Sequence, residues 1–211
     1  TANCTASSTV QDATPQPPKT FPISPVQIDT WKNEAAAGGT ISGISVGNGQ
    51  SITLGPKKIN GNIVMGNTST ITLTGTVWVT GTINLGNSAT IRLDPAVYGS
   101  LSGVIVLDGA VDFGNTAILQ GSGQAGSHLM VLSTFGPGDA IDLGNSASGA
   151  ILYAPNGIID IGNGLSLREA TGRGMRTGNN TTITYESGLM NLNFSSGPSG
   201  GYQIRSWKEV E

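Results

Sequence analysis

A short sequence motif that recurs along this 211-residue chain constrains its fold more than any other feature. The motif joins an apolar–x–apolar triplet to Gly-Asn, as in "INLGN" (83–87), "VDFGN" (111–115), "IDLGN" (141–145) and "IDIGN" (159–163). Its Gly-Asn pair begins at Gly47, Gly66, Gly86, Gly114, Gly144, Gly162 and Gly178. Self-similarity at intervals of about twenty residues is the signature of a repeat architecture.

Each repeat contains three short runs of alternating apolar residues that meet at Gly-rich or Asn-rich corners. Gly and Asn tolerate the left-handed backbone conformation that a sharp corner needs. We therefore predict an all-β fold, a right-handed parallel β-helix with three faces and about seven coils. The 28- and 30-residue intervals predict loops at "DPAVYGSLS" (94–102) and at "GSGQAGSH" (121–128) or "TFGPGD" (134–139). A Gly-rich β-sandwich is the alternative.

Three segments are expected along the chain. Residues 1–23 are rich in proline and predict an extended arm. Residues 24–39 predict a short helix that plugs the first coil, because Ser24, Pro25 and Gln27 form a capping box with proline at the first helical position. Residues 40–211 form the predicted β-helix domain, and its closing "YQIRSWKEVE" reads as a last strand in which Trp207 covers the core.

Composition narrows the class of protein. Charged residues make up only 11% of the chain, against roughly 25% in ordinary soluble domains. There is no basic patch for nucleic acid, and no apolar stretch approaches the length of a membrane span. Together with 32 glycines, these features favour an extracellular or cell-surface location. Cys4 is the only cysteine, so it cannot form an internal disulfide and is a candidate for an intermolecular thiol bond.

The middle residues of the triplets are predicted to form one outward ladder. They are Ser45, Val64, Asn84, Asp112, Asp142 and Asp160. In register, neighbours would lie about 4.8 Å apart, so the three carboxylates would repel each other unless something offsets their charge. They could bind Ca²⁺, act as the acid and base of a polysaccharide-cleaving enzyme, or form a solvated polar face.

We expect this ladder not to be catalytic and the protein to have no cofactor, with calcium as the alternative. The only histidine, His128, lies in a predicted loop and is expected to be structural, and Arg92 and Arg168 are isolated in the sequence. A threonine-rich face at Thr53, Thr72 and Thr184 is typical of ice-binding proteins, but Arg92 interrupts it.

The strands predicted for the third face do not alternate between apolar and polar residues. Their sequences are "TVWVT" (76–80), "GVIVLDG" (103–109), "LMVLS" (129–133) and "AILYAP" (150–155). Strands that are apolar throughout are typical of a sheet buried on both sides. We predict that Trp78, Val106, Val131 and Tyr153 lie beneath a cover. The predicted cover is the arm, anchored by Val10, Phe21 and Ile23 and supplied by the same chain or by a neighbouring subunit.

Several phrases together resemble a group of bacterial surface proteins identified as PilX-like or type IV pilus-associated. They include "FPISPVQIDTWKNEAAAGGTISG", "TGTVWVTGTI", "ITYESGLMNLNFSSGP" and "SWKEVE", and the resemblance runs from about residue 20 to the end. It implies a surface-linked or filament-linked β-helix and supplies no catalytic residues. Members of the group begin with a pilin-like apolar helix that this sequence lacks.

Two functions are therefore predicted. The first is a non-enzymatic extracellular structural or adhesive module, cell-surface or pilus-associated. It would assemble head to tail into a homo-oligomer or homopolymer through its arm. The second is a β-helix that binds or cleaves polysaccharide.

Overall fold

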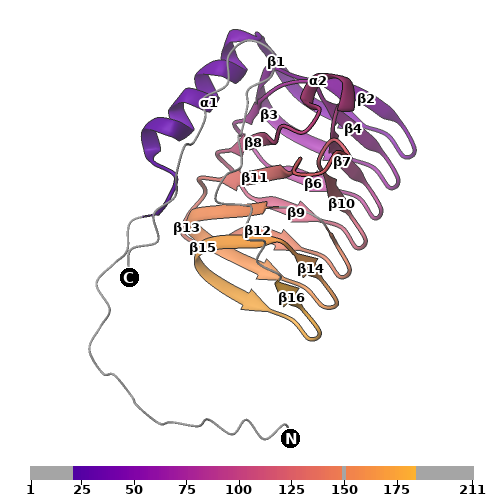
Figure 1. Cartoon of the computed structure of the whole chain (residues 1–211), viewed down its shortest axis with the longest axis vertical. Coiled ribbons are helices and arrows are strands. Elements are labelled where there is room, and N and C mark those ends of the chain that lie inside the picture. Colours follow the sequence, from indigo (N-terminus) through magenta and orange to yellow (C-terminus); the bar gives the residue numbers. More distant parts are fainter. Residues whose placement is uncertain (1–20, 149–150, 184–211) are drawn as a thin grey trace, which may run out of the picture.

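A computed structural model describes residues 21–148 and 151–183 as a stack of short parallel strands beside one long helix (Figure 1). The helices are α1 (Pro25–Ala37) and α2 (Pro95–Tyr98). The largest sheet contains β1 (Thr40–Val46), β3 (Lys57–Met65), β5 (Val77–Val79), β6 (Ile83–Leu85), β8 (Gly103–Leu107), β9 (Val111–Phe113), β11 (Leu129–Ser133), β12 (Asp139–Leu143), β13 (Ile151–Ile161) and β15 (Glu169–Thr177). The second contains β2 (Ser51–Leu54), β4 (Thr70–Leu73), β7 (Thr90–Leu93) and β10 (Ile118–Gln120), and β14 (Ser166–Leu167) pairs with β16 (Thr182–Ile183).

Within the described residues, all paired strands are parallel. In the largest sheet the pairing path runs β3–β5–β8–β11–β13–β12–β9–β6 and returns to β3. The strand pairing is thus that of a closed, all-parallel, eight-stranded barrel. It is not that of the predicted three-faced right-handed β-helix, or β-solenoid, with about seven coils, and the fold-class prediction is corrected.

The closure depends on two long strands. The first residues of β3 (Lys57–Ile59) pair with β5, and its last residues (Ile63–Met65) pair with β6. In the same way, β13 pairs with β11 at its start and with β12 at its end. The segment Asn60-Gly61-Asn62, whose residue types are common in turns, stays within β3. Two of the predicted faces therefore join into one sheet.

The stacking of the Gly-Asn pairs at one corner is confirmed. Each asparagine Oδ1 accepts a hydrogen bond from the backbone N–H of the next asparagine along the stack. The bonds, 2.8–3.0 Å long, link Asn48, Asn67, Asn87, Asn115, Asn145, Asn163 and Asn179 in that order. We refer to this line as the asparagine ladder.

The strands enclose an apolar core. Inward residues such as Ile59, Ile83 and Ile141 are at most 1% exposed. Helix α2 lies in the segment 94–102 that the sequence predicted as a loop. Asp94 caps it by accepting a hydrogen bond from the Ala96 N–H, and its Tyr98 is buried.

Helix α1 begins as the sequence predicts. Ser24 is its N-cap and accepts a hydrogen bond from the Gln27 N–H, with Pro25 at the first helical position. The position of the helix corrects the prediction. Instead of plugging an end of the stack, α1 lies across β3, β5 and β8 (Figure 1).

Candidate functional site

The predicted line of carboxylates is present on the outer face of the largest sheet. Asp142 lies in register between Asp112 on β9 and Asp160 on β13. The next residue in the line is Arg176 on β15, opposite Asp160. Strand pairing therefore places a cation at the end of three adjacent acids.

Arg176 offsets part of the carboxylate charge. Its Nε lies 3.1 Å from Asp160 Oδ2, and its guanidinium also pairs with Asp139. Desolvation is the largest cause that raises the pKa of Asp142, followed by repulsion from Asp112 and Asp160. Arg176 opposes this shift. Arg176 was not predicted, because the seventh Gly-Asn pair follows "MRT", in which threonine breaks the triplet pattern. The position of Arg176 before that pair was the available signal.

Among the described residues, no set of side chains is arranged to bind calcium. Among residues 21–148 and 151–183, no group of three or more His, Cys, Asp or Glu side chains is arranged to hold a metal ion. Strand positions hold the carboxylates of Asp112, Asp142 and Asp160 in a row rather than around a common centre. Calcium binding by these residues stays a prediction.

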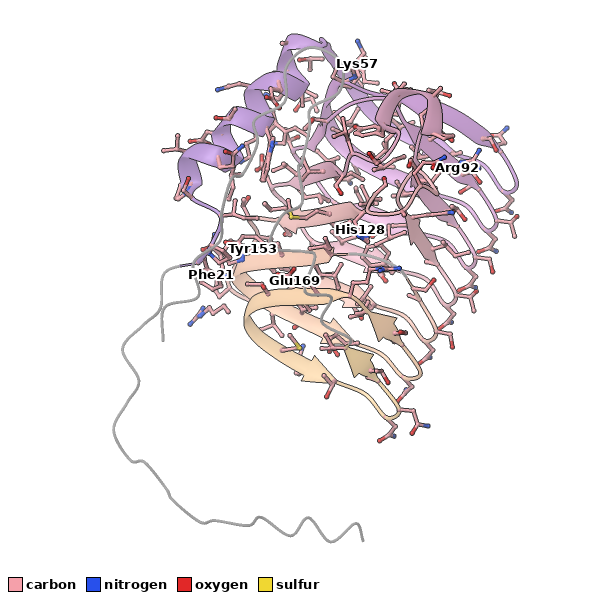
Figure 2. All side chains as sticks on the ribbon, in the orientation of Figure 1. Phe21, Lys57, Arg92, His128, Tyr153 and Glu169 are labelled. Carbon is pink, nitrogen blue, oxygen red and sulfur yellow. The ribbon has the colours of Figure 1, made fainter. Side chains whose placement is uncertain are left out.

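The apolar outer face lies beneath α1 and the residues that precede it. Tyr153 is buried, and its hydroxyl lies 3.2 Å from both the backbone N and the backbone O of Ile23. Figure 2 shows the ring of Phe21 beside that of Tyr153, and their centroids are 6.0 Å apart. Val106 is fully buried in the same cluster. Val131 instead points into the core within the strands, so its predicted place on this face is wrong.

The other buried residues of the cluster on this outer face explain why these strands do not alternate between apolar and polar residues. They are Ile28, Trp31, Val104, Met130, Leu132 and Ile151. Their neighbours along the strands, among them Ile105 and Leu152, belong to the core on the opposite side of the sheet. Strands β8 and β11 are thus buried on both faces. We refer to the outer cluster, with Ile23, Val106 and Tyr153, as the α1 cluster.

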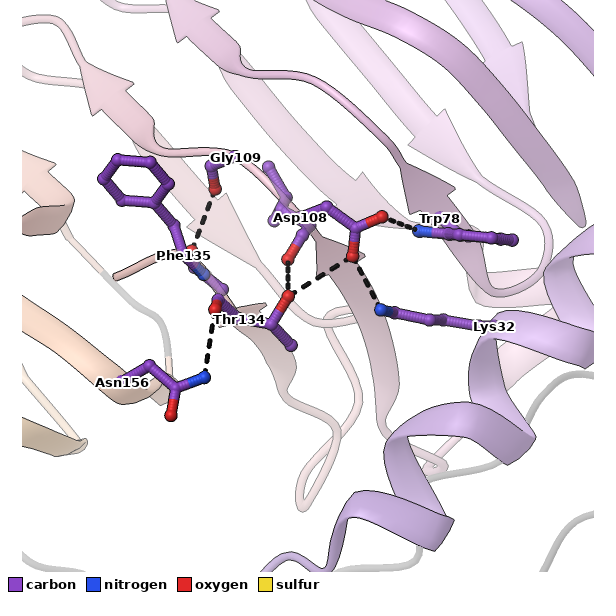
Figure 3. A network of polar contacts seen from close by, with 9 residues as sticks. Lys32, Trp78, Asp108, Gly109, Thr134, Phe135 and Asn156 are labelled. Atoms are coloured by element: carbon purple, nitrogen blue, oxygen red, sulfur yellow. Dashed lines mark hydrogen bonds and ion pairs between the residues drawn. The ribbon is translucent and has the colours of Figure 1, made fainter. Parts of the chain in front are cut away.

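A network of polar contacts joins α1 to the sheet beside this cluster (Figure 3). Trp78 Nε1 donates a hydrogen bond of 2.9 Å to Asp108 Oδ2, and Lys32 Nζ on α1 lies 2.6 Å from Asp108 Oδ1. Lys58 Nζ lies 3.9 Å from the centre of the Trp78 ring, within cation–π range. Half-buried Trp78 therefore takes part in a network within one chain. The cover that the sequence analysis assigned to the arm is supplied mainly by α1.

A cavity of about 700 Å³ lies beside the loop that connects β10 to β11. Polar residues in its wall include Gln120, Gln124, Ser127, Ser148 and Arg168. His128 also borders the cavity and is buried. Its backbone N–H donates to Ser102 Oγ and its carbonyl accepts from the Gly103 N–H, which ties the loop to β8. Sequence reasoning identified this loop but not the cavity.

The threonine face is interrupted as predicted. Thr53, Thr72 and Arg92 occupy one line across β2, β4 and β7, and Arg92 Nε donates to Thr72 Oγ1. Thr184 lies outside the described residues. So do Cys4, Val10 and Trp207, for which the intermolecular thiol, the arm anchor and the core cover stay predictions.

No protein-family model, curated protein or solved structure matches this chain. None of the comparisons therefore links it to PilX-like or pilus-associated proteins, and the resemblance stays a prediction. In residues 21–148 and 151–183, no helix is both long enough and apolar enough to cross a membrane.

Proposed function

We propose that this protein is a non-enzymatic structural module of the bacterial cell exterior. The observation that carries the proposal is the asparagine ladder, which links one Gly-Asn corner to the next from Asn48 to Asn179. Its amides are exposed, yet their oxygens bond to the neighbouring repeat. Such a ladder supports rigidity along the stack and does not gather reactive groups.

The charge balance of the acidic line supports the same function. A glycosidase needs two carboxyl groups that face a bound sugar from opposite sides of the scissile bond. Asp142 and Asp160 instead lie side by side on neighbouring strands, on one face of the sheet, and Asp160 pairs with Arg176. This arrangement favours a solvated surface that is partly neutralised by its own cation.

Polymer cleavage and surface location test this function. The full chain should release no reducing ends from pectin-like or alginate-like polymers, and Asp142→Asn should behave as the parent does. Brief protease treatment of intact producing cells should remove the protein while leaving a cytosolic marker untouched. Cleavage that disappears in Asp142→Asn, or full protection from the protease, would contradict the proposal.

Polysaccharide binding is the second candidate function, and the cavity beside Gly121–His128 favours it. Its amide, hydroxyl and guanidinium groups are of the kinds that hydrogen-bond to sugar hydroxyls. Calorimetric titration with neutral and uronic-acid oligosaccharides tests this function. Gln124→Ala should weaken binding, whereas Thr53→Ala, on an exposed strand face outside the wall of the cavity, should not.

A further inference from the structure

Each end of the strand stack carries strands that have a partner on one edge only, among the residues that the structure describes. At one end, β1 pairs only with β3 and β2 only with β4 within residues 21–148 and 151–183. At the other end, in the same part of the chain, β15 pairs only with β13 and β16 only with β14. Within the described residues, each of these strands leaves one edge without a partner strand (Figure 1).

The β1–β2 end leaves core positions open. Ile41 is 40% exposed, whereas Ile59, its register partner on β3, is fully buried. Ile44 and Ile52 are also partly exposed, although their partners on β3 and β4 are buried. These isoleucines lack the next layer that covers their equivalents.

The column of Ile44 ends in an exposed side chain at the β15–β16 end. The column that begins at Ile44 passes through Ile63, Ile83, Val111, Ile141 and Ile159 and ends at Met175. Met175 is 41% exposed, although Ile159 beneath it is fully buried. Ile183 is 42% exposed above buried Leu167. Each end therefore presents the type of residue that would cover the other.

The asparagine ladder makes the ends complementary as well as similar. Every bond runs from a backbone N–H to the Oδ1 of the preceding asparagine. The donor of Asn48 and the acceptor of Asn179 therefore have no ladder neighbour among the described residues. Stacking the Asn48 end of one molecule on the Asn179 end of another would make the missing bond.

We propose that a second copy of this chain stacks end to end on the first, with β15 and β16 of one molecule against β1 and β2 of the next. The contact would continue the apolar columns, the parallel strands and the asparagine ladder. Because it joins two different surfaces, its repetition gives an open filament. The inference rests on the proposed structural function and names its partner and its surface.

Gln50 limits how strongly the ends associate. Its side-chain Oε1 accepts the Gly47 N–H at 2.9 Å. At later corners the equivalent N–H donates to a carbonyl of the preceding layer, as from Gly66 to Val46 and from Gly178 to Ile161. Gln50 therefore occupies the place that the partner's Thr177 carbonyl would take. Its side chain must move aside before the copies stack, so we expect Gln50→Ala to increase association.

Disulfide trapping tests the contact in the full chain. With Cys4→Ser as background, Ser51→Cys and Thr182→Cys are made as separate variants. Both sites are exposed and lie in one line at opposite ends of the stack. In a stacked pair they become neighbours with Cα atoms about 5 Å apart, which a disulfide can bridge. Oxidising the mixture should yield heterodimers well above the homodimers of either variant alone.

Thr90→Cys, in the middle of the same line, is the matched control for Ser51→Cys. Circular dichroism and the monomer mass under reduction establish that each variant folds. Adding Gln50→Ala should raise the heterodimer yield. A heterodimer yield no higher than that of the control would overturn the inference, including the case in which residues 184–211 of the same chain cover the β15–β16 end. Polymer cleavage by these samples would instead contradict the structural function and leave the trapping result intact.

Discussion

At the Gly-Asn corners after the first, the glycines lie directly against the backbone of the preceding layer. A Cβ built on Gly144 would lie 2.5 Å from the Phe113 carbonyl oxygen, so glycine is needed for space between layers. The left-handed residue is the one after asparagine, such as Ser146 with φ of 59°. That conformation was predicted for Gly and Asn. Serine and threonine carry no strong preference for it, so the corner's geometry could not be predicted from them.

Replacing Gly144 with alanine should therefore destabilise the fold by about 1–3 kcal/mol, the usual cost of overpacking. Gly174→Ala is the control, because its added Cβ would meet the nearest atom, Ile158 Cγ1, at an ordinary 3.5 Å. Urea unfolding followed by circular dichroism measures both changes. Equal stability of the two variants would contradict the steric function of Gly144.

Asp142 gives a pH-dependent prediction. Its pKa is raised in the folded protein by desolvation and by its acidic neighbours. A carboxyl with a raised pKa favours the folded state in acid, and that contribution is lost as the pH rises through the raised pKa. Asp142→Asn should thus stabilise the protein at pH 7 by about 0.5 kcal/mol, the scale of like-charge strand pairs, and have no effect at pH 3.

The melting temperature at the two pH values measures this effect. Thr53→Val, on a different strand face, controls for a general effect of surface substitution. A gain for Asp142→Asn that is as large at pH 3 as at pH 7 would show that charge repulsion is not its cause.

At the scale of elements, the start of α1 is set by neighbouring residues, whereas its position in the fold is set by distant ones. Its start was predictable because Ser24 and Pro25 set the cap by themselves. Its position was not, because docking depends on the outward residues of strands that come much later in the chain, such as Val106 and Tyr153. The apolar runs did indicate that this face needs a cover. They did not identify which element provides it.

Trp31 is the largest contribution of α1 to the α1 cluster and is 2% exposed. Trp31→Ala should destabilise the protein by about 3–5 kcal/mol, through lost burial and the cavity left behind. It should also expose the α1 cluster to a hydrophobic dye. Val26→Ala on the same helix, where the side chain is 74% exposed, should change stability little. Thermal unfolding and dye fluorescence measure both variants, and an unaffected Trp31→Ala would show that α1 is not a stabilising cover.

At the scale of the whole molecule, the repeat predicted the parallel pairing and the stacked Gly-Asn corners. It did not predict the closed circuit of strands. Closure depends on β3 and β13 staying extended through "NGN" and "PNG", whose composition is typical of turns. The acidic line was likewise predictable from spacing alone. Arg176 was indicated only by its place before the seventh Gly-Asn pair. The cavity near His128 and the network around Asp108 were not predictable, because each joins residues from separate strands and loops.

The rate of amide hydrogen exchange should increase from the middle of the strand stack toward its ends. Strands β8 and β11 are buried along their whole length, and we expect their amides to exchange slowest. Strands β1, β2, β15 and β16 should exchange fastest, because each has an unpaired edge among the described residues. Mass spectrometry of peptic fragments measures the rates. Uniform protection across the strands would contradict the gradient.

The position of α1 also dictates an order of events during synthesis. The helix leaves the ribosome before the strands that it covers, and the Tyr153 hydroxyl that bonds to Ile23 is 130 residues away in the chain. The strands from β1 to β13 must therefore exist before α1 completes its docking. Until then the part of the α1 cluster that Ile151 and Tyr153 supply is missing, and a chain interrupted before residue 151 would leave Ile23 without its bond to Tyr153. Helix α1, which precedes all the strands in the described part of the chain, thus completes its packing after most of them.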